Sequence, residues 1–136
     1  MEKGMSENNS VLSELKLEHV VFDMLSFQRI GFRSAEEREQ KIKVGASVDK
    51  LDDGKYRVSL KVQVEQEEEY ITEVQVSGFC TINEDCAMKD EILHKNTVAI
   101  LFPYVRSQLT LLTAQPETTP IVLPALNINA LIENAE

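Results

Sequence analysis

The sequence predicts an α+β fold, in which a long, Pro-containing helix and a short C-terminal helix pack on a four-stranded antiparallel sheet. Apolar and polar residues alternate through 42–48, 58–64 and 70–82, which is the period of a strand with one buried face. Apolar residues then recur every three or four positions through 98–112, which is the period of a helix. Short connections between the strands favour antiparallel pairing, because parallel neighbours need a long crossover.

The first apolar segment, residues 15–27, predicts the remaining strand. Its odd positions, from Leu15 to Phe27, would lie together on one buried face of a strand. Val20, Phe22 and Met24 make the even positions apolar too, so a helix is the alternative. The polar stretch at 34–40 ends the segment.

Turn residues divide the strands that follow. Asp53-Gly54 predicts a tight hairpin turn. The acidic run Glu65–Glu69 predicts a solvent-exposed hairpin tip. Gly78, inside the last strand, predicts either a bulge or a close backbone approach.

The predicted long helix is apolar around more than half of its circumference. Phe102, Tyr104 and Leu111 lie outside its main stripe, and Pro103 predicts either a kink or the start of the regular helix. A short helical or irregular crossover is expected before it, at 83–93. The main stripe consists of Val98, Leu101, Val105, Leu109 and Leu112.

Prolines at 116, 120 and 124 predict an extended connection after the long helix, with exposed apolar side chains at 121–123. Asn127 or Asn129 is expected to cap a last helix over Ala130–Asn134, with Leu131 and Ile132 facing inward.

Composition excludes several classes of function. The net charge of -9, from 23 acidic and 14 basic side chains, argues against nucleic acid and anionic membranes as partners. The N-terminus lacks the apolar segment of a signal peptide, so we expect a cytoplasmic protein with a disordered start at 1–10 and one domain at 11–136.

No residue pattern indicates catalysis, a metal or a cofactor. Cys80 and Cys86 lack metal-binding spacing and are expected to be buried or half-buried thiols. His19 and His94 lie far apart and are expected at the surface or in packing contacts. Because no phosphate-binding, zinc or nucleophile motif occurs either, the sequence predicts a protein that is not an enzyme.

The apolar surface exceeds what one helix on one sheet can cover. We therefore expect self-association through the second face of the Val98–Leu112 helix. The alternative is a compact monomer that buries the whole helix.

Four stretches resemble the SecB family of protein-export chaperones. ILFPYVR (100–106) followed by LPALNINAL (123–131) is similar to the family's C-terminal signature. ITEVQVSGFCTI (71–82) and VFDMLSF (21–27) are similar to two of its strands. The resemblance implies a homotetramer, built as a dimer of dimers, that binds unfolded preproteins without ATP and passes them to the SecA motor. We place the subunit contact at Leu101, Phe102, Val105 and Leu109.

By the same resemblance, a client-binding groove lies between the sheet and the connection after the long helix. Such a chaperone needs apolar grooves for alternate client side chains and many weak sites on one assembly. For Val74 and Val76 ordinary core packing is an equal alternative. The expected lining residues are Ile71, Val74, Val76, Phe79, Tyr104, Leu112, Val122 and Leu123.

The resemblance is incomplete at the motor-docking surface. Glu73 matches a glutamate of the family's flat acidic surface, but Met24 and Gln28 occupy two positions that are acidic in the family. Three functions therefore remain open: export, service to a single client such as an antitoxin, and an adaptor subunit without chaperone activity.

Overall fold

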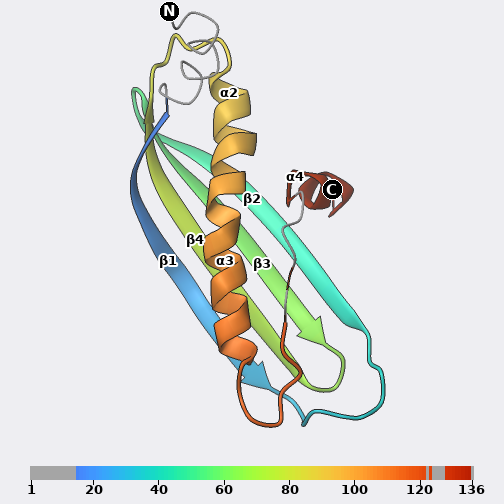
Figure 1. Ribbon diagram of the computed structural model, residues 1–136. Helices are drawn as coiled ribbons and strands as arrows, with labels where there is room; N and C mark the ends of the chain where they lie inside the picture. The colour runs from blue at the N-terminus through green and yellow to red at the C-terminus, as the bar shows by residue number, and fades with distance from the viewer. Residues whose placement is uncertain (1–14, 122, 124–127, 136) are drawn as a thin grey trace, which may run out of the picture.

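Four antiparallel strands form one sheet. The computed structural model describes residues 15–121, 123 and 128–135. The strands lie in the order β1-β4-β3-β2, with β1 and β2 at the edges (Figure 1). Their bounds are β1 Leu15–Arg29, β2 Gln40–Asp52, β3 Lys55–Gln66 and β4 Tyr70–Ile82.

The helices cover one face of this sheet, which we call the core face; the other is the open face (Figure 1). The helical layer starts with α2 (Lys89–Glu91), continues through a π-helical turn (Ile92–Asn96) into α3 (Thr97–Thr113), and ends with α4 (Ile128–Ala135). This arrangement confirms the predicted fold class. No helix within the described residues is long and apolar enough to cross a membrane.

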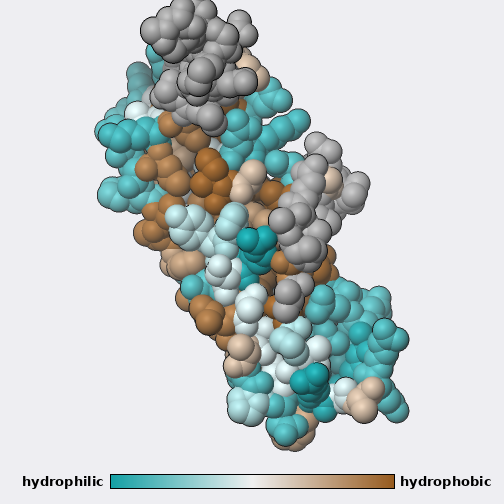
Figure 2. Space-filling view, in the orientation of Figure 1, coloured by the Kyte–Doolittle hydropathy of each residue, from teal (hydrophilic) through white to brown (hydrophobic). Residues whose placement is uncertain are grey.

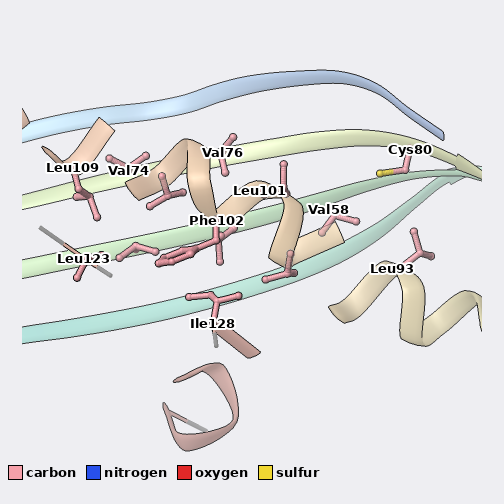
Figure 3. Packing of buried hydrophobic residues seen from close by; sticks show 14 of the residues in the cluster. Val58, Val74, Val76, Cys80, Leu93, Leu101, Phe102, Leu109, Leu123 and Ile128 are labelled. Atoms are coloured by element: carbon pink, nitrogen blue, oxygen red, sulfur yellow. The ribbon is translucent and has the colours of Figure 1, made fainter. Parts of the chain in front are cut away.

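Side chains of β3 and β4 alternate between the two faces as predicted. Even-numbered residues of both strands are buried on the core face, whereas most odd-numbered ones are half-buried or exposed on the open face. Figure 3 shows Val58, Val74 and Val76 on the side of the sheet that faces α3, and Cys80 nearer the end where Leu93 lies. Cys80 is therefore a buried thiol, as expected, and Cys86 is half-buried.

The first segment is strand β1, so the helical alternative was wrong. The prediction that its odd residues share one face was also wrong. Shifts in pairing between Leu17 and His19, and between Phe22 and Met24, each reverse the alternation. The core face of β1 therefore carries Leu15, Leu17, Val20, Phe22, Leu25 and Phe27, which is why both sets of positions are apolar.

The β2–β3 turn follows the prediction, and the β3–β4 tip follows it only in part. Gly54 has φ +70°, a conformation that glycine adopts at little cost. Glu67 and Glu68 are exposed at the tip, but Glu69 is only 1% exposed. The assignment of the whole acidic run to solvent was wrong at Gln66, which is buried within β3, and at Glu69, whose side chain turns toward the connection after α3.

The predicted stripe of α3 packs on the sheet. Val98, Leu101, Val105 and Leu109 are buried, and Leu112 is half-buried. Phe102, which was expected outside the stripe, is buried as well. The helix continues through Pro103. Because proline has no N–H, the Ala99 carbonyl four residues earlier lacks its helical hydrogen-bond donor. Both residues are exposed. Water can reach that carbonyl, so the proline is tolerated.

The described part of the Pro-rich connection packs against the rest of the same chain, which corrects the prediction of exposed apolar side chains at Ile121 and Leu123. Ile121 and Leu123 are buried. The Thr113 hydroxyl accepts a hydrogen bond from the Ile121 N–H at 2.9 Å, and the Thr110 hydroxyl donates to the Ile121 carbonyl at 3.2 Å. Val122, Asn127 and the side chain of Leu131 lie outside the described residues. Ile128 and Ile132 of α4 pack on the core.

Gly78 allows two apolar side chains to approach β4 closely. A Cβ added there would lie 2.9 Å from Leu17 Cδ1 and 3.2 Å from Leu101 Cδ2. The close approach at Gly78 is thus made by side chains and not by backbone, which corrects the prediction, and a larger residue there would have to displace Leu17 and Leu101.

Candidate functional site

An exposed apolar surface runs along β1 and α3. We call Phe22, Leu25, Ile100, Tyr104 and Leu111 the β1–α3 apolar surface; their side chains are 37%, 46%, 41%, 43% and 65% exposed. Figure 2 shows hydrophobic atoms gathered on this side of the helical layer. Fully burying one such side chain contributes about 1.5–3 kcal/mol. A patch of this kind indicates an interface.

The sequence places these residues together in two ways. The bulge after Phe22 directs that side chain and Leu25 to the core face, but β1 is an edge strand and α3 does not cover them. Ile100, Tyr104 and Leu111 lie four and seven residues apart, so they share the outward side of α3.

Phe22 and Tyr104 form the centre of this surface. Their rings pack edge to face, with centroids 6.5 Å apart. A hollow beside them is lined by Phe22, Pro103, Tyr104, Ser107 and Gln108. The hollow can receive an apolar side chain from another polypeptide.

A second apolar strip follows the core face of the edge strand β2. Ile42 is 39% exposed there, Val44 and Val48 are half-buried, and Ala46 is exposed. Among the described strands none pairs with the outer edge of β2, so its backbone groups on that side are available. Alternate apolar side chains beside an unpaired edge suit an extended polypeptide.

The structure does not bring the predicted client-groove residues together. Val74 and Val76 are buried under α3, whereas Ile71 and Phe79 are half-buried on the open face. Strand alternation separates these two pairs, because adjacent residues point to opposite faces.

The other predicted groove residues are spread along the helical layer. Tyr104 is exposed, Leu112 is half-buried and Leu123 is buried. Val122 lies outside the described residues. Among the predicted groove residues that the structure describes, only Tyr104 therefore offers a large open apolar surface.

The residues predicted for the subunit contact lie in the core of a single chain. Leu101, Val105 and Leu109 are fully buried and Phe102 nearly so. They pack against β3 and β4 and leave almost no surface for a second copy, so this assignment is corrected. The opposite side of α3, which carries Ile100, Tyr104 and Leu111, is the side that remains available.

Glu73 lies on the open face, opposite Ser26 of β1. Met24 and Gln28 occupy the same face two residues to either side. Lys61 Nζ lies 3.6 Å from Glu73 Oε1, and the Glu73 side chain is only 12% exposed. The one acid that matches the motor-docking pattern is thus recessed and paired with a cation.

A buried carboxylate holds the connection that follows α3. Glu69 accepts hydrogen bonds from the Thr119 N–H and, at 2.8 Å, from the Thr119 hydroxyl. The neighbouring Tyr70 hydroxyl donates to the Thr119 carbonyl at 2.8 Å, and burial is the main cause that raises its pKa to about 12. Nothing in the sequence distinguishes Glu69 from the glutamates beside it.

Arg29, at the end of β1, holds the same connection from the other side. Its guanidinium donates to the Gly31 carbonyl at 2.8 Å, to the Glu117 carbonyl at 3.2 Å and to the Thr118 hydroxyl. It also stacks over the rings of Phe27 and Phe32. The connection is therefore attached to both strands at the same end of the sheet, where β1 ends and β4 begins.

A charged cluster ties the crossover before α2 to the β2–β3 turn. Glu84 accepts from Lys89 Nζ and from the Tyr56 hydroxyl, both at 2.8 Å, and from the Gly54 N–H at 2.5 Å. The Lys89 ammonium is the main cause that holds the pKa of Glu84 well below its usual range. Glu84 in turn raises the pKa of Lys89.

Comparison with known proteins places the chain in a family. The family described as preprotein translocase subunit SecB matches residues 8–136. The protein-export protein SecB of Acinetobacter baumannii is 29% identical over 137 residues, covering 95% of this chain and 90% of its own. That of Saccharophagus degradans is 30% identical over 98 residues, covering 68% of this chain and 58% of its own.

One further relative is similar in sequence, and one solved structure is similar in fold. An uncharacterized protein of Methanocaldococcus jannaschii, MJ0357, is 28% identical over 112 residues, covering 74% of this chain and 72% of its own. A similar fold occurs in the SecB-like chaperone Rv1957 of Mycobacterium tuberculosis, which was solved in complex with a ChAD peptide from the antitoxin HigA1. The two structures superpose with a TM-score of 0.73 and 12% sequence identity, covering 85% of this chain and 93% of the other. Because the family match spans nearly the whole sequence, this chain belongs to the SecB family, whose members are chaperones and not enzymes.

Proposed function

We propose that this chaperone holds unfolded polypeptides without ATP, as a homotetramer built from two dimers. The observation that carries the proposal is the pair of apolar surfaces that one chain leaves partly exposed, one along β1 and α3 and one along the core face of β2. Membership of the SecB family supports the same conclusion.

The two apolar surfaces suit two different occupants. The β1–α3 apolar surface is broad and contains a ring pair, so we assign it to the contact between copies. The strip on β2 is narrow and borders an unpaired edge, so we assign it to the extended client. Several such strips on one assembly raise the effective concentration of client segments, so individually weak contacts add up to firm binding.

Aggregation of a denatured client tests the proposal. Near-stoichiometric protein is expected to suppress the light scattering of the client. Ile42→Glu places a charge in the β2 strip and is expected to weaken suppression at least several-fold, whereas Ser47→Glu, on the open face of the same strand, leaves it intact. A wild-type protein without effect on scattering would leave the adaptor role as the better assignment.

Service to one client is the second candidate, and the open face favours it. Met24 and Gln28 stand where a motor-docking surface needs acids, and Lys61 pairs with Glu73. The SecB-like chaperone of Mycobacterium tuberculosis is bound to an antitoxin peptide, which is a precedent for such a role. If the SecA motor pulls down this protein and Glu73→Lys abolishes the interaction, export is supported. If one small protein encoded by a neighbouring gene co-purifies with it, the dedicated role is supported.

A further inference from the structure

The connection after α3 contains a segment that lies on the core face as an extended polypeptide. We call residues 119–121 together with Leu123 the strap. Ile121 and Leu123 are 1% and 9% exposed, whereas Pro120 is exposed, so buried residues alternate along the segment. Figure 3 shows Leu123 on the side of the sheet that faces α3. The strap therefore places alternate apolar side chains in the core.

The start of β4 binds the backbone of the first strap residue. The Thr119 N–H donates to the Glu69 carboxylate, and the Thr119 carbonyl accepts from the Tyr70 hydroxyl at 2.8 Å. The Thr119 hydroxyl also donates to Glu69 Oε1 at 2.8 Å. One acidic acceptor and one hydroxyl donor thus satisfy both backbone groups of a single residue.

The end of α3 binds a second strap residue in the same way. The Ile121 N–H donates to the Thr113 hydroxyl at 2.9 Å, and the Ile121 carbonyl accepts from the Thr110 hydroxyl at 3.2 Å. Thr119 and Ile121 are two positions apart, which is the spacing at which a neighbouring strand binds both backbone groups of a residue in an antiparallel ladder. We call the four side chains that bind these groups the backbone-binding site: Glu69, Tyr70, Thr110 and Thr113.

Release of the strap would break no helix or strand of the described chain. The strap belongs to neither kind of element, and its first neighbour toward α3 is anchored separately. The Glu117 carbonyl accepts from the Arg33 N–H at 2.9 Å and from the Arg29 guanidinium at 3.2 Å. The strap can therefore leave while the start of the connection stays attached.

A vacated backbone-binding site would favour another extended polypeptide. The Thr113 hydroxyl also donates to the Leu109 carbonyl at 2.8 Å, and the Thr110 hydroxyl lies 3.0 Å from the Arg106 carbonyl, so both keep a partner within α3. The buried carboxylate and phenol of the site would lose their described partner, which is unfavourable. A new backbone N–H and carbonyl would satisfy both groups.

We infer that the backbone-binding site is a second client site, which the strap fills at rest and vacates for an extended segment of an unfolded polypeptide. The inference rests on the proposed function and adds a site to the strip on β2. The strap shows what the site accepts: an extended segment with alternate apolar side chains, bound through backbone groups that nearly every sequence carries. Because the strap is tethered, its effective concentration is high, and a client must compete with it.

The first test uses fluorescence anisotropy with the full-length protein and a labelled peptide that has the sequence of residues 116–123, PETTPIVL. Thr119→Ala/Ile121→Ala weakens the tethered strap and leaves the backbone-binding site unchanged. We expect the peptide to bind this variant at least tenfold more tightly than wild type, because the strap competes less. Gln115→Ala, exposed in the same connection, is expected to bind it as wild type does. An unfolded, carboxymethylated protein in excess is expected to displace the peptide.

Two outcomes of this test would overturn the inference. If the peptide binds the double variant no more tightly than wild type, weakening the strap vacates no site. If the unfolded protein leaves the peptide bound, the site serves only the chain's own strap. Suppression of client aggregation by the wild-type protein separates the two proposals, because it persists if only the second site is wrong and is absent if the chaperone function is wrong.

Hydrogen exchange of the wild-type protein gives a readout that does not depend on the folding of a variant. The Ile121 amide is expected to exchange at least tenfold faster than the Val62 amide in the middle of β3, because the strap opens without the sheet. Adding the unfolded protein is expected to speed the exchange of Ile121 further and to leave that of Val62 unchanged. Equal rates for the two amides would mean that the strap opens only on global unfolding, and the inference would be wrong.

Discussion

At the scale of single residues, two buried positions are expected to be sensitive to substitution. Gly78 lies where Leu17 and Leu101 both touch β4. Glu69 lies where a buried carboxylate meets the backbone and hydroxyl of Thr119. Neither residue is exposed in the folded chain, so both act through stability.

Gly78→Val is expected to lower the free energy of unfolding by about 1–3 kcal/mol, because the added carbons must displace Leu101 and Leu17 from a packed interface. Urea denaturation measures the loss. Gly45→Val is the matched control, since a Cβ there meets no atom within 4 Å. Equal stability of the two variants would contradict the close approach of α3.

Glu69→Gln is expected to cost about 1–3 kcal/mol, because the new amide N–H₂ opposes donors from Thr119 that the carboxylate now satisfies. Glu68→Gln, in the same tip but exposed, is expected to change stability by less than about 0.5 kcal/mol. Thermal unfolding of both variants provides the comparison, and similar melting temperatures would refute the buried role of Glu69.

At the scale of elements, two attachments hold the helical layer on the sheet. The Glu84 cluster joins the crossover to the β2–β3 turn, and Glu69 with Arg29 joins the connection after α3 to the other end of the sheet. Both attachments use side chains at turns, where the regular backbone bonds of strands and helices end. The hydrophobic core lies between them.

The Glu84 attachment predicts a pH dependence. The folded-state pKa of Glu84 is depressed, so its contribution is present above the unfolded value of about 4.3 and is lost as pH falls toward the folded value. Lys89 has a raised pKa, so its contribution is complete at neutral pH. Urea midpoints of wild type and Glu84→Gln are expected to differ most above about pH 5 and to converge in acid; a constant difference would count against the cluster.

At the scale of the whole molecule, the β1–α3 apolar surface is exposed in a single chain, and a contiguous patch of this kind indicates an interface. Burying the β1–α3 apolar surface between copies would remove five large side chains from solvent. The core of a single chain is complete without it, so assembly is a separate step from folding.

Tyr104→Glu/Leu111→Glu is expected to dissociate the assembly without unfolding the chain, because both side chains are exposed in the single copy. Sedimentation velocity gives the mass, and circular dichroism confirms the fold. His94→Glu, exposed in the π-helical turn, is the control. A double variant that keeps the wild-type mass would move the contact elsewhere.

Salt is expected to tighten the assembly. Each copy carries a net charge of -9, and ions screen the repulsion between copies over about 10 Å at 0.1 M. The dissociation constant, measured by dilution at several salt concentrations, should fall as salt rises. Dissociation on adding salt would show that ion pairs, and not apolar contacts, hold the copies together.

The sequence by itself determined the strands β2 to β4, the Asp53-Gly54 turn and the buried stripe of α3. These features depend on local periodicity and turn chemistry, which the geometry of the chain sets within a few residues. The resemblance to the SecB family could also be recognised from the sequence, because each of its motifs is a continuous stretch of residues.

Only the tertiary structure decided which side chains meet. The bulges of β1 follow from its pairing with β4, and they put Phe22 on the same core face as Leu17 and Leu25. Leu123 and Glu69 are buried because the connection folds back on the sheet, a contact between residues far apart in sequence. Burial depends on what lies across from a residue, and no periodicity along the chain contains that information.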